Sequence, residues 1–318
     1  MTVFGTRPEA IKVAPVIEEL EKNSELFESI VCTTSQHRQM LDQMLELFKI
    51  EPDIDLKLMR ENQTLAGLTS LVMTAATEAL IAKRPDAVLV QGDTTTAAVT
   101  ALAGFYQKIP VGHIEAGLRT QDVYNPFPEE ANRKLISAVA TFNFAPTSHA
   151  ANNLLAEGIP PNRIVQTGNT IVDALFAIDE KYHDLVLPLD ISKGKNVILV
   201  TAHRRENFGC PLLNICTALK SIVNTEPNVE IVYPVHLNPN VRDVVYEQLG
   251  NVERIHLVEP LNYHELVTMM KNAHIILTDS GGVQEEAPSF GKPVLVMRST
   301  TERPEGVDAG VAKLVGTE

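Results

Sequence analysis

Short runs rich in Val and Ile alternate with longer segments of helical periodicity, and this alternation constrains the fold more than any other feature. Apolar runs of this length are typical of strands in parallel sheets whose two faces are covered by helices. The sequence therefore predicts an α/β fold. The predicted strands are Thr2–Phe4, Ala87–Gln91, Pro110–Ile114, Val197–Thr201, Val229–Val235, His274–Thr278 and Pro293–Met297. The predicted helices include Pro8–Lys22, Thr94–Gln107, Pro128–Val139, Leu212–Val223 and Gly282–Phe290.

The alternation weakens between Tyr182 and Lys195, where Pro, Gly and charged residues are mixed before a new strand begins. The chain has 318 residues, about twice the length of a typical single domain. We therefore predict two domains, residues 1–182 and 183–318, each a Rossmann-like, doubly wound parallel sheet, facing each other across a cleft. Ligands of such sheets bind beyond the carboxyl ends of the strands, so the residues directly after each strand are the candidates for function.

Charge and composition exclude several classes of protein. The chain is 44% hydrophobic and 21% charged, as in ordinary globular proteins rather than disordered or fibrous ones. Its 27 Lys and Arg residues against 40 Asp and Glu give a net charge of −13. Because no run of basic residues offsets this charge, a nucleic-acid partner is not expected. A small anionic ligand remains possible, since a few focused cations and helix N-termini can bind phosphate.

Cysteine usage and hydropathy predict a cytoplasmic protein without a membrane partner. Cys32, Cys210 and Cys216 are odd in number and form no C-x-x-C pair, which favours reduced, structural thiols. The N-terminal segment has no apolar core of a secretory signal. The longest stretch without Asp, Glu, Lys or Arg is Leu135–Ala156, and its proline, histidine and amide side chains argue against a bilayer span.

Carboxylates follow or flank predicted strands in the first half. Asp93 comes just after a strand and before a helix, where it could be an N-cap or a functional group. Glu115 ends an apolar strand, which favours function over a surface role. Glu129 lies in the first turn of a helix, where stabilisation of the helix dipole is the alternative. Several carboxylates gathered in one cleft suit proton transfer.

Cations occupy comparable places. Arg7 lies in the loop after the first strand and Lys12 one turn into the next helix, so both could reach a phosphate at the helix N-terminus; ordinary surface roles are the alternative. His203 follows a strand and precedes Arg204, and it could contact a phosphate or move a proton. His236 occupies a similar position with less support.

The segment Asp279–Glu286 is the most informative. Its two glycines allow backbone N–H groups to approach a diphosphate, its serine adds a hydroxyl, and its last glutamate could accept both hydroxyls of a ribose. Two arginines follow the next strand. The segment therefore favours a nucleotide-diphosphate site over a plain helix cap. The residues concerned are Ser280, Gly281, Gly282, Glu286, Arg298 and Arg303.

Several nucleotide-binding and hydrolase motifs are absent. No G-x-G-x-x-G follows a strand, and neither GxxxxGK[ST] nor G-x-S-x-G occurs. A dinucleotide-dependent dehydrogenase, a P-loop nucleotidase and the commonest type of serine hydrolase are therefore not favoured.

Segments along the whole chain resemble the motifs of one family. They are GTRPEAIK, QHRQMLDQ, QGDTTT, HIEAGLRT, PFPEEANR, TGNTIVDAL, TAHRREN, PVHLNP, DSGGVQEEAPS, GKPVLVMR and TTERPEG. From its first residues to its last, the chain resembles the non-hydrolysing bacterial UDP-N-acetylglucosamine 2-epimerases.

This resemblance implies a fold of the glycosyltransferase-B type with UDP in the cleft. It also implies reversible inversion at C2 between UDP-N-acetylglucosamine and UDP-N-acetylmannosamine, which supplies precursors of cell-envelope polysaccharides. The reaction would eliminate UDP to give 2-acetamidoglucal and then add UDP again, without a cofactor or metal. By motif, the UDP-binding residues are Arg7, Lys12, His203, Ser280, Gly281, Gly282, Glu286 and Arg303. The implied catalytic residues are Asp93, Glu115, Glu129 and His203.

Three further expectations come from the resemblance. Many bacterial members bind a second UDP-N-acetylglucosamine as an activator, and Asn62 here replaces an arginine of the regulated relatives, which removes a charge-assisted contact. Members are commonly homodimers. Family chains usually extend further at both ends, so this chain is expected to lack part of its first strand and the last helices of its second domain. The positions that match the activator site are Gln36, Gln39, Glu129, Arg204 and His236.

Three other functions compete with this one. A sugar transferase of the same fold would use the same glycines and cations, but it would not need three carboxylates in the first domain. A hydrolysing epimerase would release free N-acetylmannosamine. A silent nucleotide-sugar sensor would keep the glycine-rich site and lose the carboxylates, whereas Asp93, Glu115 and Glu129 are all present.

Overall fold

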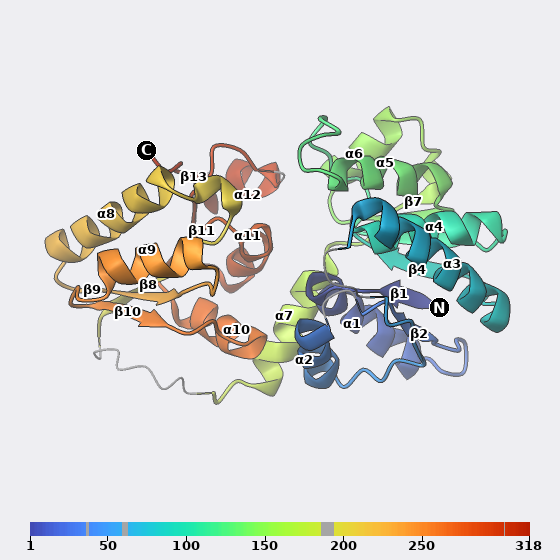
Figure 1. Ribbon diagram of the computed structural model, residues 1–318, viewed down its shortest axis with the longest axis horizontal. Helices are drawn as coiled ribbons and strands as arrows, with labels where there is room; N and C mark the ends of the chain where they lie inside the picture. Colours follow the sequence, from blue (N-terminus) through green and yellow to red (C-terminus); the bar gives the residue numbers. More distant parts are fainter. Residues whose placement is uncertain (36–37, 59–62, 186–193, 302) are drawn as a thin grey trace. The chain divides into compact units, whose positions relative to one another are not determined.

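The computed structural model describes residues 1–35, 38–58, 63–185, 194–301 and 303–318. The chain divides into two compact units, Met1–Ala174 and Leu175–Glu318, and each contains one parallel sheet with helices (Figure 1). The division falls inside helix α7 (Thr170–Lys181), whereas the boundary predicted from sequence follows Tyr182.

The described part of the first unit contains a seven-stranded sheet in the order β3-β2-β1-β4-β5-β6-β7, and its strand pairs are all parallel. The order reverses between β1 and β4, so the carboxyl ends of these two strands flank the place where doubly wound sheets bind ligands. The strands are β1 (Thr2–Phe4), β2 (Val31–Thr33), β3 (Ile54–Asp55), β4 (Val88–Gln91), β5 (Val111–Ile114), β6 (Phe142–Ala145) and β7 (Ile164–Gln166).

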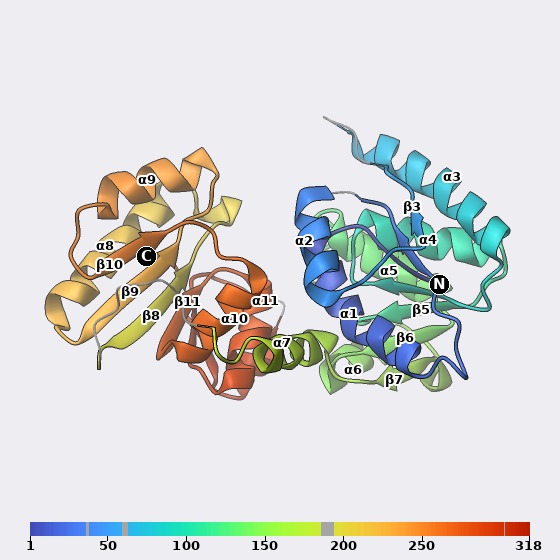
Figure 2. The ribbon, with the colours of Figure 1, turned by 90° about the horizontal axis from the view of Figure 1, so that it is seen from below.

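Helices cover both faces of this sheet (Figure 2). Threonines begin several of them, because a threonine hydroxyl accepts a hydrogen bond from a free N–H group of the first turn. Thr94 caps α4 in this way, so the alternative that Asp93 is the cap is wrong. The helices are α1 (Arg7–Lys22), α2 (Arg38–Phe48), α3 (Leu65–Lys83), α4 (Thr95–Tyr106), α5 (Glu129–Val139), α6 (Ser148–Ala156) and α7, with a 3-10 turn at Pro161–Arg163.

The main core of the first unit lies between the sheet and the helices α3, α4 and α5, which pack side by side. Small residues of α4 allow close packing on the strands: a Cβ atom at Gly104 would lie 2.9 Å from Cγ1 of Val88. Buried members of this core include Val72, Val90 and Ile136. The dense core fixes the position of β4 and therefore of the residues that follow it.

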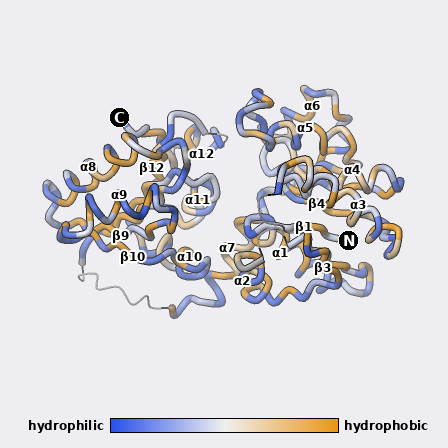
Figure 3. The backbone as a smooth tube through the Cα atoms, viewed as in Figure 1, coloured by the Kyte–Doolittle hydropathy of each residue, from blue (hydrophilic) through white to orange (hydrophobic). Residues whose placement is uncertain are grey.

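Helix α3 is long and apolar enough, by length and composition, to span a membrane, and in the described part of the chain no other helix meets this test. This is weak support for a span, because core helices meet the same criteria. Here α3 packs along α4, and both carry many hydrophobic residues (Figure 3). The stretch singled out from the sequence, Leu135–Ala156, instead contains parts of α5 and α6 with β6 between them.

The described part of the second unit contains a six-stranded parallel sheet in the order β10-β9-β8-β11-β12-β13, so β8 and β11 take the places of β1 and β4. Its strands are β8 (Asn196–Thr201), β9 (Val229–Pro234), β10 (Ile255–Val258), β11 (Ile275–Thr278), β12 (Val294–Val296) and β13 (Ala312–Leu314). Its helices are α8 (Cys210–Thr225), α9 (Pro239–Leu249), α10 (Tyr263–Asn272), α11 (Gly281–Glu286) and α12 (Pro304–Asp308), with 3-10 turns at Arg205–Asn207 and Ala287–Phe290. The predicted class, two doubly wound parallel-sheet domains, is confirmed.

The helix predicted over Gly282–Phe290 is shorter than expected. The α-helical part α11 ends at Glu286, and the 3-10 turn that follows contains Pro288. Proline has no N–H group to continue the helical hydrogen bonding, so the chain tightens and then leaves through the left-handed Gly291. The other predicted strands and helices are found within about two residues of their expected ends, the usual uncertainty of element boundaries.

Candidate functional site

Lys12 and Glu115, which are 103 residues apart in sequence, form a buried ion pair in the first unit. Lys12 Nζ lies 2.5 Å from Glu115 Oε1, and the two side chains are 10% and 6% exposed. Lys12 points there because α1 begins directly after β1, where Thr6 and Glu9 form a capping box. Arg7, the first residue of α1, is half-buried at the same strand end. A residue predicted to bind UDP thus contacts one predicted to transfer protons.

The Glu115 carboxylate also accepts hydrogen bonds from two amides. Gln91, the last residue of β4, donates to Oε2, and Asn169 Nδ2 lies 3.4 Å from Oε1. The backbone of Glu115 is left-handed, with φ of +65°, a conformation that is uncommon for residues other than glycine. Such backbone is often retained where the position of a side chain matters for function. Glu115 is therefore held by its backbone and by donors from three separate segments.

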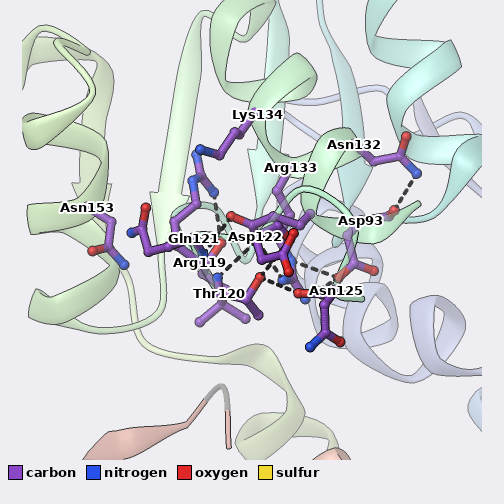
Figure 4. A network of polar contacts seen from close by, with 12 residues as sticks. Asp93, Arg119, Thr120, Gln121, Asp122, Asn125, Asn132, Arg133, Lys134 and Asn153 are labelled. Atoms are coloured by element: carbon purple, nitrogen blue, oxygen red, sulfur yellow. Dashed lines mark hydrogen bonds and ion pairs between the residues drawn. The ribbon is translucent and has the colours of Figure 1, made fainter. Parts of the chain in front are cut away.

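Asp93 is held by a buried arginine of α5 (Figure 4). Arg133 Nη2 and Nε lie 2.6 Å and 2.9 Å from Asp93 Oδ2, and Asn132 Nδ2 donates to the Asp93 carbonyl at 2.8 Å. Asp93 remains 28% exposed while Arg133 is 8% exposed. The arginine therefore fixes the carboxylate from the protein side and leaves part of it accessible.

The same arginine connects Asp93 to the loop before α5. Arg133 Nη1 lies 3.1 Å from Oε2 of Glu130, whose side chain is fully buried. Glu130 in turn accepts hydrogen bonds from the backbone N–H groups of Thr120 at 3.1 Å and Gln121 at 3.3 Å. Glu130 is therefore a structural carboxylate, although the sequence places it beside Glu129 in the same helical turn.

Glu129 differs from the other two predicted acid/base residues. Its Oε2 atom is buried and has no hydrogen-bond partner among the described residues. Glu129 and Asp93 line the same cavity of about 400 Å³, to which Thr6, Thr94 and Asn132 also contribute. Two of the three predicted carboxylates, Asp93 and Glu129, therefore line one cavity.

Two buried groups contact segments that line or adjoin this cavity. Glu9 accepts hydrogen bonds from Gly5, Thr6 and Thr94, so one carboxylate joins the loop after β1 to the first turn of α4. Burial raises the pKa of Glu9, and these hydrogen bonds oppose the rise. Burial also lowers the pKa of His113 to about 4, so its ring is neutral near pH 7, with Nε2 2.7 Å from the Gly92 carbonyl oxygen.

In the second unit, His203 follows β8 and lies against Asp279, which follows the neighbouring strand β11. His203 Nδ1 is 3.3 Å from Asp279 Oδ1, and the imidazole is 42% exposed while Asp279 is fully buried. Desolvation lowers the pKa of His203, and the negative charge of Asp279 opposes this shift. The ring stacks on that of His236, with centroids 5.5 Å apart. Two histidines proposed from sequence for different roles are therefore neighbours.

The glycine-rich segment brings together most of the second unit's predicted UDP-binding residues. Ser280 is the N-cap of α11, and its backbone N–H donates to Thr278 Oγ1 rather than to a ligand group. A Cβ atom at Gly281 would lie 2.8 Å from Nη1 of Arg303, so the guanidinium packs on bare backbone there. Arg303 Nε also donates to Glu285. Gly282 lies one residue further into the same turn.

Glu286 is buried and oriented by a tyrosine. Its side chain is 4% exposed, and Oε1 accepts a hydrogen bond of 2.7 Å from the hydroxyl of Tyr263, the first residue of α10. Arg298, the other cation predicted near this edge, is instead paired with Glu206 at 2.8 Å.

The positions predicted for an activator are only partly described. Gln36 and Asn62 lie outside the described residues, and so does the side chain of Gln39. Arg204 is half-buried and His236 exposed, both at the carboxyl end of the second sheet.

The sequence analysis missed several residues that hold the predicted ones. All of them except Tyr263 stood inside motifs already quoted, for example Gln91 in QGDTTT and Arg133 in PFPEEANR. Their presence in these motifs was the only signal available. The partners come from distant segments, so their roles required the fold. The missed residues are Glu9, Gln91, Glu130, Arg133, Asn169, Tyr263 and Asp279.

The polar clusters contain no evident metal centre. Among the residues that the structure describes, no group of three or more His, Cys, Asp or Glu side chains is arranged to hold a metal ion. The cationic and N–H groups instead provide ligands for an anion.

Comparison with known proteins identifies relatives over the whole chain. The family model described as UDP-N-acetylglucosamine 2-epimerase matches residues 18–318. The UDP-N-acetylglucosamine 2-epimerase of Salmonella typhimurium is 53% identical over 330 residues, which cover 100% of this chain and 86% of the relative.

Solved structures agree with this result. The crystal structure of UDP-GlcNAc 2-epimerase from Neisseria meningitidis bound to UDP-GlcNAc is 52% identical, has a TM-score of 0.93, and is matched over 100% of this chain and 87% of that one. The Methanocaldococcus jannaschii UDP-GlcNAc 2-epimerase in complex with UDP-GlcNAc and UDP is 34% identical, with a TM-score of 0.81 and coverage of 99% and 88%. The chain therefore belongs to the UDP-N-acetylglucosamine 2-epimerase family of isomerases.

Proposed function

We propose that this chain interconverts UDP-N-acetylglucosamine and UDP-N-acetylmannosamine by inverting C2. The observation that carries the proposal is the cavity of the first unit, where Asp93 and Glu129 are brought together from β4 and α5. A transferase of the same fold has no need for paired acid/base groups there. Relatives with solved structures bind UDP-GlcNAc and UDP, which fits the glycine-rich segment of the second unit.

The proposed chemistry is elimination followed by re-addition. A carboxylate removes the C2 proton, the bond between C1 and the diphosphate oxygen breaks, and 2-acetamidoglucal and UDP result. UDP then adds back to C1 while a proton is delivered to the opposite face of C2, so atoms and charge balance over the cycle. Asp93, Glu115 and Glu129 are the acid/base groups, and a positioned group of this type contributes about 10²–10⁴-fold to the rate.

The leaving diphosphate needs donors that stabilise its growing negative charge. In the first unit we assign this role to Arg7 and Lys12, and in the second to His203, the hydroxyl of Ser280 and the backbone N–H groups of Gly281 and Gly282. Arg303, packed on Gly281, adds a guanidinium. Glu286, held by Tyr263, would accept the ribose hydroxyls.

Further parts of the proposal rest on the family resemblance. A second UDP-N-acetylglucosamine would bind near Glu129, Arg204 and His236 as an activator. The product would serve cell-envelope polysaccharide synthesis in the cytoplasm, without a nucleic-acid or membrane partner. The family resemblance also implies a homodimer.

Exchange of the C2 proton tests the proposed reaction. The protein is incubated with UDP-N-acetylglucosamine in D₂O, and C2 is followed by NMR. We expect deuterium at C2 with UDP still attached, together with UDP-N-acetylmannosamine. Release of free N-acetylmannosamine and UDP would indicate the hydrolysing reaction instead. Absence of exchange without an acceptor sugar would contradict both epimerase reactions and favour a transferase.

A further inference from the structure

Asp279 is a fully buried carboxylate whose two oxygens have different surroundings. Oδ2 accepts three hydrogen bonds: from the backbone N–H of His203 at 2.9 Å, from that of Arg204 at 2.8 Å, and from Asn207 Nδ2 at 2.9 Å. These bonds tie the end of β11 to the turn after β8. If Asp279 only held these two segments together, Oδ2 would be sufficient. The surroundings of Oδ1 therefore need a separate explanation.

Oδ1 of the same carboxylate is buried and has no hydrogen-bond partner that meets ordinary geometry among the described residues. Leaving a buried charged oxygen without a donor costs free energy. His203 Nδ1 lies 3.3 Å away, at an angle outside that of a formed bond. A small rotation of the imidazole would bring an Nδ1–H group onto Oδ1.

Two contacts limit the movement of the imidazole. Its backbone N–H is already fixed on Oδ2 of Asp279, and one face of the ring stacks on His236 at an interplanar angle of 16°. The charged and titratable groups that act on His203 are Asp279, His236 and Arg204. Of these three, Asp279 is the one that can accept a proton donor at Nδ1.

We propose that Asp279 is a positioning residue for His203: its Oδ1 accepts the Nδ1–H group and thereby selects the tautomer that leaves Nε2 free for the ligand. In this tautomer Nε2 can take a proton and, as part of an imidazolium, donate to a phosphate oxygen while Asp279 balances the charge. The contact between Nε2 and the diphosphate rests on the proposed function. The selection of the tautomer by Asp279 is independent of that function.

The tautomer can be measured directly. Protein labelled with ¹⁵N-histidine is studied by long-range ¹H–¹⁵N correlation at a pH where His203 is neutral, and the His203 signals are assigned by their loss in His203→Gln. We expect the pattern of a protonated Nδ1 and an unprotonated Nε2. The opposite pattern in the unaltered protein would overturn the proposal, and this result needs no Asp279 variant to fold.

The Asp279→Asn variant provides the second arm. Its amide oxygen can replace Oδ2 and keep the three N–H bonds, while its NH₂ group faces His203 Nδ1 and can only donate. We therefore expect His203 to change to the Nε2-protonated tautomer. Unchanged His203 signals in folded Asp279→Asn protein would also overturn the proposal, because a structural carboxylate would not control the tautomer.

A matched control is Glu230→Gln. Glu230 is buried on β9 near the amino end of the sheet, and its Oε2 lies 2.9 Å from His256 Nε2. The same loss of charge there should alter the His256 signals and leave those of His203 unchanged. A His203 change in this variant equal to that in Asp279→Asn would mean that the effect is not local, and would count against the proposal.

Ligand binding separates this proposal from the proposed function. We expect Asp279→Asn to weaken UDP binding in calorimetry by about threefold to tenfold, because Nε2–H then donates to phosphate from a neutral ring, and a charge-assisted hydrogen bond is roughly twice as strong as a neutral one. If the tautomer changes and UDP affinity does not, Nε2 has no role toward the diphosphate, and the ligand part of the proposal is wrong. If C2 exchange fails while the tautomer behaves as expected, the proposed reaction is wrong and the positioning role of Asp279 stands.

Discussion

The two units have the same strand order around their switch points but hold their polar groups by different means. In the first unit each of two functional carboxylates is paired with a cation, Asp93 with Arg133 and Glu115 with Lys12. In the second unit the corresponding turns are held by backbone N–H groups on Asp279 and by the packing of Arg303 on Gly281. At the predicted proton-transfer groups the first unit thus uses ion pairs, whereas after β11 the second unit uses backbone N–H groups on a carboxylate and a guanidinium packed on glycine.

The difference matches the chemistry proposed for each unit. Proton transfer requires carboxylates at fixed positions, and buried cations can fix them. Binding of a diphosphate requires open backbone and N–H donors, which glycine provides because it has no side chain. We therefore expect substitutions in the first unit to affect turnover or stability, and substitutions in the second to affect the affinity for UDP.

The largest expected effect is on stability and concerns Arg133. Its replacement by alanine leaves the fully buried Glu130 and part of Asp93 without their cation, and breaking a buried pair in this way costs about 3–5 kcal/mol. Urea unfolding measures this loss. The matched control is Arg242→Ala in the second unit, whose ion pair with Asp243 is exposed, so its loss should stay below about 1 kcal/mol. Equal losses in the two variants would contradict the role assigned to the buried network.

The next effect is on turnover. Asp93→Asn, Glu115→Gln and Glu129→Gln should each lower kcat by about two orders of magnitude or more, because each removes a positioned acid or base. The affinity for UDP, measured by calorimetry, should change much less. Glu18→Gln, at an exposed position of α1, is the control for the loss of one charge. A near-normal kcat in any of the three variants would remove that residue from the mechanism.

The smallest expected effect concerns Gly281. An alanine there would place its Cβ 2.8 Å from the Arg303 guanidinium, which is the flexible end of a side chain and can move. We expect UDP to bind about tenfold more weakly, which corresponds to a loss of about 1.4 kcal/mol in binding free energy. We expect kcat to be nearly unchanged. The control is Gly306→Ala, whose Cβ would lie 3.5 Å from Cβ of Ala312, an ordinary van der Waals contact; Gly310 is unsuitable because its φ is +74°. If Gly281→Ala lowers kcat and leaves UDP affinity intact, the proposed division of tasks between the units fails.

The fold was predictable because its signals are local. Runs of Val and Ile and glycine turns are read from a few neighbouring residues, and they identified the strands and helices that flank each switch point. The one helix predicted too long, Gly282–Phe290, contains a proline whose effect on hydrogen bonding was overlooked. Many candidate site residues also have a local signal, since they follow a strand or lie early in a helix, and the full set came from the family resemblance.

The sequence by itself determined the fold class, the family and the residues that carry chemical groups. Only the tertiary structure decided how these groups are held: that Lys12 contacts Glu115, that Arg133 fixes Asp93, and that Asp279 lies against His203. Secondary structure depends on residues a few positions apart, whereas an ion pair depends on two strand ends meeting at one sheet edge. No local sequence pattern predicts such a contact between two strand ends, because the contact follows from the packing of the whole unit.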